Sequence, residues 1–346
     1  MSPQCRRLLL YAPNIHGGGG VVLLQSLLKA WPDDWCLVAW LDARAQSRLH
    51  LPANSQVEWV VPSFASRLRA EFTLAKNSGP DDHILCFHGL PPLLPNKGKL
   101  IIFQQNRNYL GLVPLRSFAW RTRQRLRFEQ TVARLFRHRC ASYWVQTPSM
   151  ARELQKWYGK KPVSIRILPF SEAATQMAGN EPARWDFIYV ADGVAHKNHV
   201  RLVEAWVLLA REGLKPSLAL TLSDRDAALA AWIRLRIAEH GLRISDLGQL
   251  PHDDLMRLYA QSKALVFPSI SESFGLPLIE ARQIGLPIVA SELDFVRDVC
   301  EPVQSFDPCS PISIARAVRR FLGQAEAPLQ PVDASEFLGA VMDGTV

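Results

Sequence analysis

The chain has 346 residues, of which 48% are apolar and 21% are charged, a balance typical of folded proteins that excludes disorder as the main state. Because one domain holds about 100–200 residues, this length predicts two domains. The longest apolar runs, such as Leu8–Pro13 and Ala264–Pro268, are far shorter than the roughly 20 residues that cross a bilayer. The apolar stretch before Pro13 is also too short for a signal peptide, so we expect a cytoplasmic protein.

Apolar, β-rich runs alternate with helical patterns along the chain, which is typical of parallel sheets covered by helices. In residues 1–170 the expected strands are Leu8–Ala12, Trp35–Leu41, Val57–Val61, Ile84–Phe87, Leu100–Phe103, Tyr143–Gln146 and Ile165–Leu168. The expected helices cover 20–31, 64–77, 116–139 and 148–158. Residues 1–170 are therefore predicted to form a first α/β domain.

Residues 171–184 have little pattern and contain Gly179, Asn180 and Pro182, so they are the expected linker. The alternation then restarts, with strands expected at Phe187–Val190, Leu218–Leu222, Leu265–Phe267 and Ile288–Ala290. Helices are expected at His199–Glu212, at Asp226–His240, from Asp253 onward, and in a short segment before residue 288. This predicts a second α/β domain over 185–322 and a tail over 323–346. Since open α/β sheets bind ligands at the carboxyl ends of their strands, the sites should follow strands in a cleft between the domains.

The net charge of +8 is distributed unevenly, because residues 1–180 carry 24 basic and 10 acidic side chains and residues 181–346 carry 16 and 22. Eight arginines and one acid lie in Arg116–Arg139. On a helix, one stripe would hold Arg123, Arg127, Gln130, Arg134 and Arg137, and another Phe128, Val132, Leu135 and Phe136. The segment is either a solvated helix or a contact site for anionic lipid or phosphate. Nucleic acid is disfavoured because no recognition motif accompanies the charge.

The segment from Phe267 to Glu280 carries the strongest chemical signal. It leaves a buried strand, passes Glu272 in a loop and enters a helix with Pro277 in its first turn. The N–H groups of Ser273, Phe274, Gly275 and Leu276 would lie at the positive end of that helix and form an anion site. Glu280 would lie among apolar residues, where a carboxylate needs hydrogen bonds that the hydroxyls of a ligand can supply. In the simpler interpretation, Glu272 caps the helix and Glu280 is an exposed acid.

Three segments resemble one known family. Ser271-Glu-Ser-Phe-Gly-Leu-Pro-Leu-Ile-Glu-Ala281 resembles the Glu-x7-Glu signature of the retaining GT4 family (group 1) of GT-B glycosyltransferases, and Gly285–Ser291 is similar to the segment that this family carries after the signature. Tyr189-Val-Ala-Asp-Gly-Val-Ala-His-Lys-Asn-His199 is similar to the family's strand and Lys-Asn loop, and Gly17–Gly20 to its glycine run. The resemblance implies a GT-B fold, with two Rossmann-like parallel-sheet domains facing across a cleft. It places the acceptor on the N-terminal domain and a nucleotide-diphosphate sugar mainly on the C-terminal domain.

The family's residue roles carry over where the motifs match. Lys197 is expected on the diphosphate, Glu280 on the ribose hydroxyls, and Glu272 beside the transferred sugar as a catalytic carboxylate. The other expected donor contacts are made by Ser273, Phe274, Gly275, Leu276, Gly17, Gly18 and Gly19.

The sequence also departs from the family pattern. Many members have an arginine after the strand, where this chain has Ala191-Asp192-Gly193. Either diphosphate binding is weaker, or His196 or Arg201 supplies the second cation. In place of the family's His-Asp pair, Gln105 and Asn106 are the acceptor-side candidates. His88 is either catalytic or a buried histidine satisfied by the backbone.

We therefore expect a retaining, metal-independent hexosyltransferase that extends a lipid-linked glycan of the cell-surface polysaccharide or O-antigen type, with mannose among the candidate sugars. There is no Asp-x-Asp in a suitable loop and no cysteine cluster at zinc spacing, so no metal or other cofactor is expected. The expected contacts with the anionic inner membrane surface are Arg123, Arg127, Arg134 and Arg137, with Trp120 as an anchor. The alternatives are a GT-B epimerase or glycogen synthase-like enzyme, and a GT-B binding or scaffold subunit without turnover.

Overall fold

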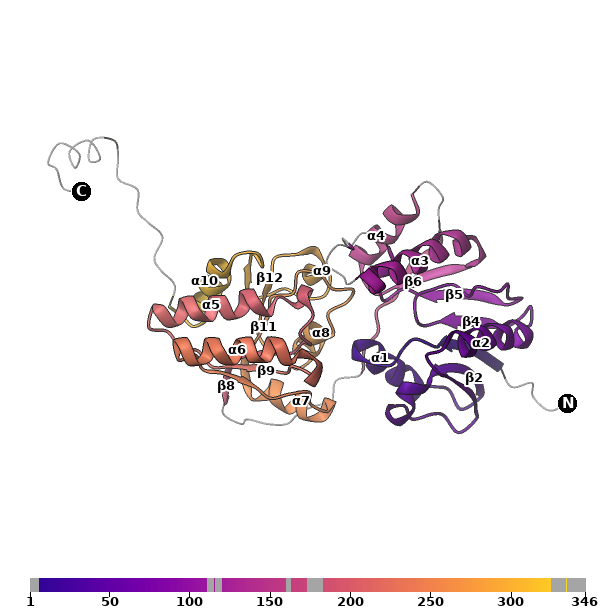
Figure 1. The fold of residues 1–346 in the computed structure, drawn as a ribbon, viewed down its shortest axis with the longest axis horizontal. Coiled ribbons are helices and arrows are strands. Elements are labelled where there is room, and N and C mark those ends of the chain that lie inside the picture. The colour runs from indigo at the N-terminus through magenta and orange to yellow at the C-terminus, as the bar shows by residue number, and fades with distance from the viewer. Residues whose placement is uncertain are drawn as a thin grey trace.

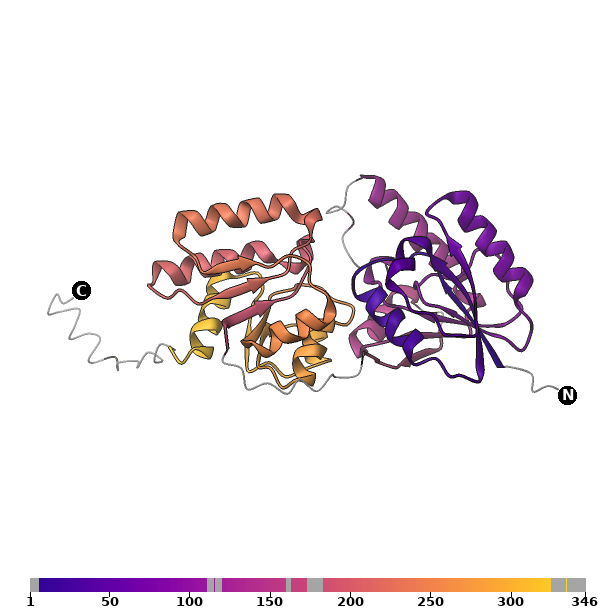
Figure 2. The same ribbon diagram turned by 90° about the horizontal axis from the view of Figure 1, so that it is seen from below.

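The computed structural model describes residues 6–110, 115, 120–159, 163–172, 183–324 and 334. Two α/β domains lie side by side along the long axis, with the N-terminal domain on the right in Figure 1 and the C-terminal domain on the left. The view from below separates the same two bodies (Figure 2). The expected linker and tail fall mostly outside the described residues.

The N-terminal domain is built on one parallel sheet of seven strands in the order β3-β2-β1-β4-β5-β6-β7. The strands are β1 (Arg6–Ala12), β2 (Trp35–Asp42), β3 (Ser55–Val60), β4 (His83–Cys86), β5 (Lys99–Phe103), β6 (Ser142–Val145) and β7 (Ile165–Ile167). The helices are α1 (Gly18–Lys29), α2 (Phe64–Asn77), α3 (Trp120–Phe136) and α4 (Pro148–Tyr158), with the short 3-10 segments η1 (Ala43–Arg48), η2 (Arg107–Leu110) and η4 (Arg137–Arg139). Local signals fix several helix starts. The hydroxyl of Thr147, for example, accepts from the Met150 N–H and caps α4.

The C-terminal domain has a second parallel sheet, of six strands in the order β10-β9-β8-β11-β12-β13. The strands are β8 (Trp185–Tyr189), β9 (Leu218–Leu220), β10 (Ile244–Asp246), β11 (Ser262–Phe267), β12 (Ile288–Ser291) and β13 (Gln304–Phe306). The helices are α5 (His199–Arg211), α6 (Ala227–His240), α7 (His252–Ala260), α8 (Leu276–Gln283), α9 (Asp294–Arg297) and α10 (Pro311–Phe321), with 3-10 segments η5 (Ala195–Lys197) and η6 (Asp224–Asp226). Two parallel sheets covered by helices confirm the expected fold class.

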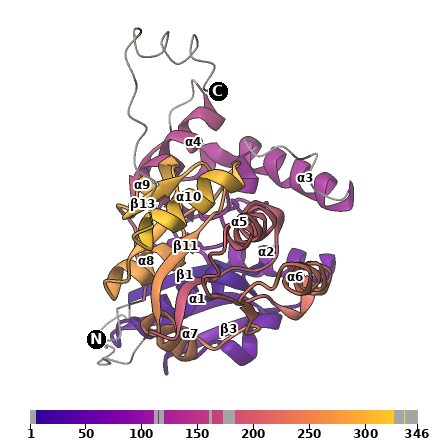
Figure 3. The ribbon, with the colours of Figure 1, turned by 90° about the vertical axis from the view of Figure 1, so that its left-hand side faces the viewer.

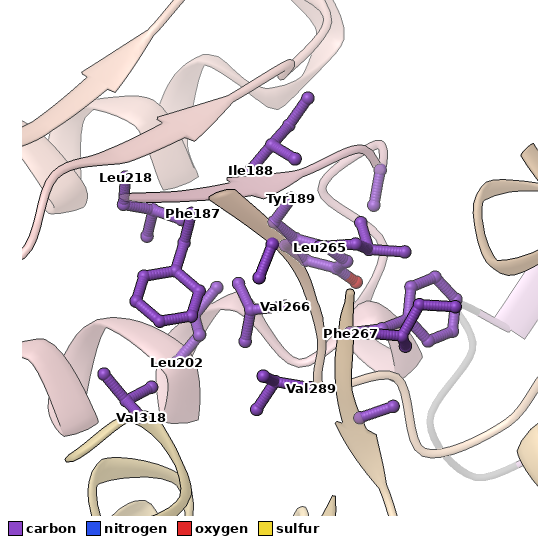
Figure 4. Packing of buried hydrophobic residues seen from close by; sticks show 14 of the residues in the cluster. Phe187, Ile188, Tyr189, Leu202, Leu218, Leu265, Val266, Phe267, Val289 and Val318 are labelled. Carbon is purple, nitrogen blue, oxygen red and sulfur yellow. The ribbon is translucent and has the colours of Figure 1, made fainter. Parts of the chain in front are cut away.

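Each domain has its own hydrophobic core. In the C-terminal domain Phe187, Val266 and Val289 point from neighbouring strands toward Leu202 on α5 and Val318 on α10 (Figure 4). Complete burial of each such side chain stabilises the fold by about 1.5–3 kcal/mol relative to exposure. The buried residues of the N-terminal domain form clusters separate from this one, so each sheet is covered by apolar residues of its own domain.

The strand orders place one reversal point in each sheet. In the first sheet the chain winds outward from β1 through β2 to β3 and then returns to β4, on the other side of β1. In the second sheet β8 likewise separates β9 from β11. Ligands of open α/β sheets bind outside the carboxyl ends of strands at such reversals. A site is therefore expected in the segments after β1, β4, β8 and β11.

The interpretation of α3 was partly wrong. Within the described residues the helix runs from Trp120, and the first part of the expected range, 116–119, lies outside the described residues. Gln130, which the pattern placed on the exposed basic stripe, is buried, whereas Phe128 and Leu135 from the expected apolar stripe are 62% and 61% exposed. The exposed face therefore has apolar side chains beside its arginines. Figure 3 shows α3 well separated from α8.

Several C-terminal elements escaped prediction, namely β10, β13, α9 and α10.

Among the described helices, none has both the length and the apolar character that crossing a bilayer requires.

Candidate active site between the domains

The loop between β11 and α8 presents unpaired backbone N–H groups. Gly275 precedes the helix with a φ of 77°, a conformation that side chains with a Cβ rarely adopt. Pro277 occupies the first turn, where a missing N–H costs nothing. In the described chain, the N–H groups of Phe274 and Gly275 meet no protein acceptor, while the Phe274 ring is buried in the core. The backbone here thus leaves free N–H donors at the start of a helix, where the sequence predicts an anion site.

Lys197 and Glu272 form an ion pair, with 2.7 Å between Lys197 Nζ and Glu272 Oε1. The two side chains are 16% and 11% exposed. Lys197 ends η5 after β8, and Glu272 follows β11, the neighbouring strand. The Tyr189 hydroxyl donates to the Lys197 carbonyl oxygen at 2.6 Å and fixes the backbone there. The two residues that the sequence assigned to donor chemistry therefore lie in direct contact.

Asn198, the residue after Lys197, ties this loop to two others. Its side-chain amide donates to the carbonyl oxygens of Pro268 and Pro308, at 3.0 and 2.8 Å. The Lys197 loop and the Glu272 loop are thus held in a fixed relation from within the C-terminal domain.

Glu280 lies inside α8 as expected, but it has a protein partner that the sequence did not reveal. The hydroxyl of Tyr259, on α7, donates to Glu280 Oε2 at 2.9 Å. Burial raises the pKa of Glu280, and the hydrogen bond from Tyr259 opposes that rise. The interpretation of Glu280 as an exposed helical acid is therefore wrong. Tyr259 orients one carboxylate oxygen.

The glycine run faces this loop from the N-terminal domain. It forms the start of α1, which begins at Gly18 and not at residue 20 as predicted. A Cβ built on Gly19 would lie 2.8 Å from Leu276 Cδ1 of α8, closer than a real side chain allows. Gly17, Gly18 and Gly19 are exposed. The glycine run of the N-terminal domain is therefore in contact with α8 of the C-terminal domain, and its expected role at the diphosphate stays a prediction.

His88 and Gln105 lie at the carboxyl edge of the first sheet, just after β4 and β5. His88 Nδ1 lies 3.2 Å from the carbonyl oxygen of Tyr11, so this nitrogen carries the proton, and burial lowers the His88 pKa to about 4. Of the two interpretations of His88, this geometry matches the buried histidine satisfied by the backbone. The Gln105 side chain donates to the carbonyl oxygen of Phe87 at 2.5 Å. Asn106 accepts from the Asn108 N–H at 3.0 Å and shapes the turn into η2.

The two candidates for a second diphosphate cation do not fit that role well. Burial lowers the pKa of His196, which disfavours its charged form. Arg201 is exposed and pairs with Glu204 one helical turn along α5. The structure instead brings Arg107, from η2 of the opposite domain, to the loop of Glu272. Sequence reasoning missed Arg107, although it directly follows the Gln105-Asn106 pair. No group of three or more metal-ligating side chains occurs within the described residues.

Two Rossmann-like parallel sheets on separate domains, with the start of α8 on one domain against the glycine run on the other, define a GT-B fold. The fold matches the crystal structure of Alr3699/HepE from Anabaena in complex with UDP and glucose, with a TM-score of 0.69 over 91% of this chain and 89% of that one, at 14% identity. Residues 172–335 match the family model of the group 1 glycosyl transferases. The C-terminal domain thus belongs to the group 1 glycosyl transferases.

Relatives of known function match shorter segments. The serotype-specific mannosyltransferase WbdA of Escherichia coli is 31% identical over 147 residues, which cover 42% of this chain and 18% of WbdA. The O-antigen chain mannosyltransferase B of Escherichia coli is 33% identical over 118 residues, covering 32% of this chain and 30% of the relative. The matched segments therefore span less than a third of either relative.

Proposed function

We propose that the protein is a retaining hexosyltransferase that uses a nucleotide-diphosphate sugar to extend a lipid-linked glycan of the cell-surface polysaccharide or O-antigen type. The observation that carries the proposal is the Lys197–Glu272 ion pair in the loop that leads to the free N–H groups before α8, with Gly19 of the opposite domain against Leu276 of that helix. The likeness to a serotype-specific mannosyltransferase and to an O-antigen chain mannosyltransferase supports the polysaccharide context and makes mannose the first sugar to test.

The site offers a role for each charged group. Lys197 and the N–H groups of Phe274 and Gly275 stabilise the negative charge that develops on the leaving diphosphate. Glu272 faces the positive charge at the anomeric carbon, and Glu280 accepts hydrogen bonds from the ribose hydroxyls through the carboxylate that Tyr259 orients. Because a lysine and helix amides neutralise the leaving group, we propose that turnover needs no divalent metal.

The first test is a screen of UDP-, GDP- and dTDP-sugars, in EDTA, for thermal stabilisation and for sugar transfer. The correct donor at 100 times its dissociation constant should add about 2.7 kcal/mol to the free energy of unfolding. NMR of the product should show that the transferred sugar keeps the anomeric configuration it had in the donor. Glu280→Ala should weaken binding of the nucleotide diphosphate by about 1–3 kcal/mol, since a charged hydrogen-bond acceptor is lost. Glu204→Ala, an exposed glutamate of the same domain, is the matched control.

Other outcomes of these experiments would favour a different function or contradict one part of the proposal. Binding without transfer or hydrolysis would favour a scaffold subunit, and a changed sugar in place of a lengthened acceptor would favour an epimerase. Activity that is lost in EDTA and restored by magnesium or manganese would contradict the metal-free mechanism. Unchanged nucleotide affinity in Glu280→Ala would remove Glu280 from the site.

We further propose that the N-terminal domain contacts the anionic inner membrane surface through α3 and α2. On α3 the exposed side chains Trp120, Phe128 and Leu135 lie among arginines. On α2 Phe64 and Phe72 are 81% and 58% exposed, with Leu68 between them. Burial raises the pKa of Glu129 on α3, and the charges of Arg125 on α3 and Arg67 on α2 oppose that rise. Apolar side chains surrounded by arginine are typical of helices that lie in a membrane interface.

Changing Arg123, Arg127, Arg134 and Arg137 together to glutamine should release the protein from anionic vesicles. Each basic residue near such a surface contributes about 1 kcal/mol, and salt should weaken binding as the Debye length falls from about 8 Å at 0.15 M to about 3 Å at 1 M. Vesicle sedimentation measures both effects. Turnover of a soluble acceptor analogue should not change.

Two further variants control this experiment. Arg134 lies over the Trp157 ring at 3.7 Å, so melting temperature must be measured for the quadruple variant. Replacing both Phe64 and Phe72 by serine removes apolar contact without changing charge and should also weaken binding. The matched charge control changes four exposed arginines of the C-terminal domain, Arg211, Arg225, Arg234 and Arg243. If the wild-type protein does not bind anionic vesicles at low salt, the membrane proposal is refuted.

A further inference from the structure

Arg107 crosses from one domain to the catalytic loop of the other. It belongs to η2 of the N-terminal domain, and its Nη1 donates to Ser271 Oγ and to the carbonyl oxygen of Glu272, both at 3.0 Å. These residues are 164 and 165 positions away in sequence. The contact therefore exists only when the two domains are together.

Glu153 holds Arg107 in place on its own side of the cleft. Arg107 Nε donates to Glu153 Oε2 at 2.8 Å, and Nη2 donates to Glu153 Oε1. Both side chains are only 21% exposed. A bidentate pair fixes the plane of a guanidinium. The remaining edge of Arg107 is thus aimed at the Ser271–Glu272 loop.

Glu272 is consequently held at two points by two cations. Lys197, from the same domain, binds its carboxylate at 2.7 Å, and Arg107, from the opposite domain, binds its carbonyl oxygen. The first contact lies within one domain. The second joins the two domains and restrains the Glu272 backbone from the opposite side.

Other contacts between the domains do not make this connection. The Ser149 N–H donates to Asp298 Oδ2 at 2.8 Å, and Arg152 lies 3.3 Å from Asp294. Both join α4 to the α9 region and leave the Glu272 loop untouched. Thr147 Oγ1 reaches only Ser273, where its distance to the carbonyl oxygen is 3.5 Å. Among the described residues, the hydrogen bonds from the N-terminal domain to Glu272 come from Arg107.

Arg107 is better suited to placing Glu272 than to binding a phosphate. Its charge is already paired with the Glu153 carboxylate, and its free edge binds neutral carbonyl and hydroxyl oxygens. We propose that Arg107 is a positioning residue, which sets the Glu272 loop when the domains close so that the carboxylate reaches its reactive place only in the closed cleft. This inference rests on the proposed transferase function.

The test compares Arg107→Ala with Arg152→Ala. Both variants remove an arginine of the N-terminal domain that reaches the C-terminal domain, but only Arg107 touches the Glu272 loop. Arg107→Ala should lower kcat by about 10–100-fold, since small displacements of a reacting group are costly, while nucleotide affinity by calorimetry stays within about twofold. Arg107→Lys should recover little of the lost kcat, because a lysine ammonium group cannot replace the planar guanidinium that binds Glu153 and the Glu272 loop at once. Arg152→Ala should retain wild-type kcat.

A second readout does not depend on turnover. Hydrogen exchange of the Ser271–Gly275 backbone, measured without donor, should accelerate in Arg107→Ala and in Glu153→Gln but not in Arg152→Ala. Unchanged exchange would overturn the positioning role even if wild-type protein transfers no sugar, whereas accelerated exchange in a protein without turnover would refute the proposed function alone. Weakened nucleotide affinity with wild-type kcat would instead make Arg107 a phosphate ligand. Equal loss of kcat in Arg107→Ala and Arg152→Ala would reduce its role to general domain closure.

Discussion

Replacing Glu272 by glutamine is expected to lower the rate of sugar transfer by about 10²–10³-fold, the usual cost of removing one preorganised electrostatic group from an active site. The change keeps the shape of the side chain and removes its charge. Without that charge, nothing at this position balances the positive charge that develops at the anomeric carbon. Single-turnover transfer from the nucleotide sugar measures the effect directly.

Nucleotide binding should respond in the opposite direction. In the structure Lys197 is engaged by Glu272 at 2.7 Å, so loss of that carboxylate frees the ammonium group for the diphosphate. Calorimetry should therefore show equal or tighter binding of the nucleotide diphosphate in Glu272→Gln. Glu292→Gln is the matched control, because Glu292 is a half-exposed carboxylate of the same domain that pairs with Arg297. Transfer at the wild-type rate in Glu272→Gln would exclude Glu272 from catalysis.

Lys197→Ala is the second change with a large expected effect, a fall in kcat/KM for the donor of about 10²–10³-fold. Lys197 is the cation that the C-terminal domain directs at the expected diphosphate, and its loss leaves only backbone N–H groups to stabilise the leaving group. Steady-state kinetics with varied donor give the ratio. Lys263→Ala is the control, since Lys263 pairs with Asp186 at 2.8 Å in the same domain.

A double variant separates function from folding. Lys197→Ala leaves the largely buried Glu272 carboxylate without its partner, which is destabilising. Adding Glu272→Ala removes that unpaired charge, so the double variant should melt at a higher temperature than Lys197→Ala while remaining inactive. If Lys197→Ala lowers the melting temperature sharply but leaves kcat/KM for the donor at the wild-type value, the role of the lysine is structural.

Much of the fold could be predicted from periodicity and local signals. Helices over 64–77 and 148–158 agree with α2 and α4 at both ends, because Ser63 and Thr147 are side-chain caps that the sequence displays. The strands β10 (Ile-Ser-Asp) and β13 (Gln-Ser-Phe) were missed because each has three residues, two of them polar, whereas the equally short β9 (Leu-Ala-Leu) is apolar throughout. A run that short carries no period of its own and is a strand only because a neighbour pairs with it.

The same contrast holds for the candidate site. The contact of Lys197 with Glu272 could be expected, because both residues follow adjacent strands of one parallel sheet and their carboxyl ends share an edge. Arg107 could not be linked to Glu272 in this way, since their contact depends on how two domains are placed. The face that α3 turns toward the core could not be predicted from the helical pattern either. Tertiary packing buries Gln130, whose side chain donates to the carbonyl oxygen of Asn108 on η2.

Asn198 has a consequence for how the Lys-Asn motif tolerates substitution. Among the described residues, it is the one non-glycine residue with a positive φ, 63°, and its amide donates to Pro268 and Pro308. Glycine would accept the backbone conformation but lose both hydrogen bonds, aspartate would accept it but has no N–H to donate, and alanine would satisfy neither demand. Of these four residue types, asparagine alone meets both demands, and both are demands of folding. The two neighbouring residues of the Lys-Asn motif thus answer to separate demands: the asparagine to the architecture of the loop, and the lysine to the ligand that we propose for it.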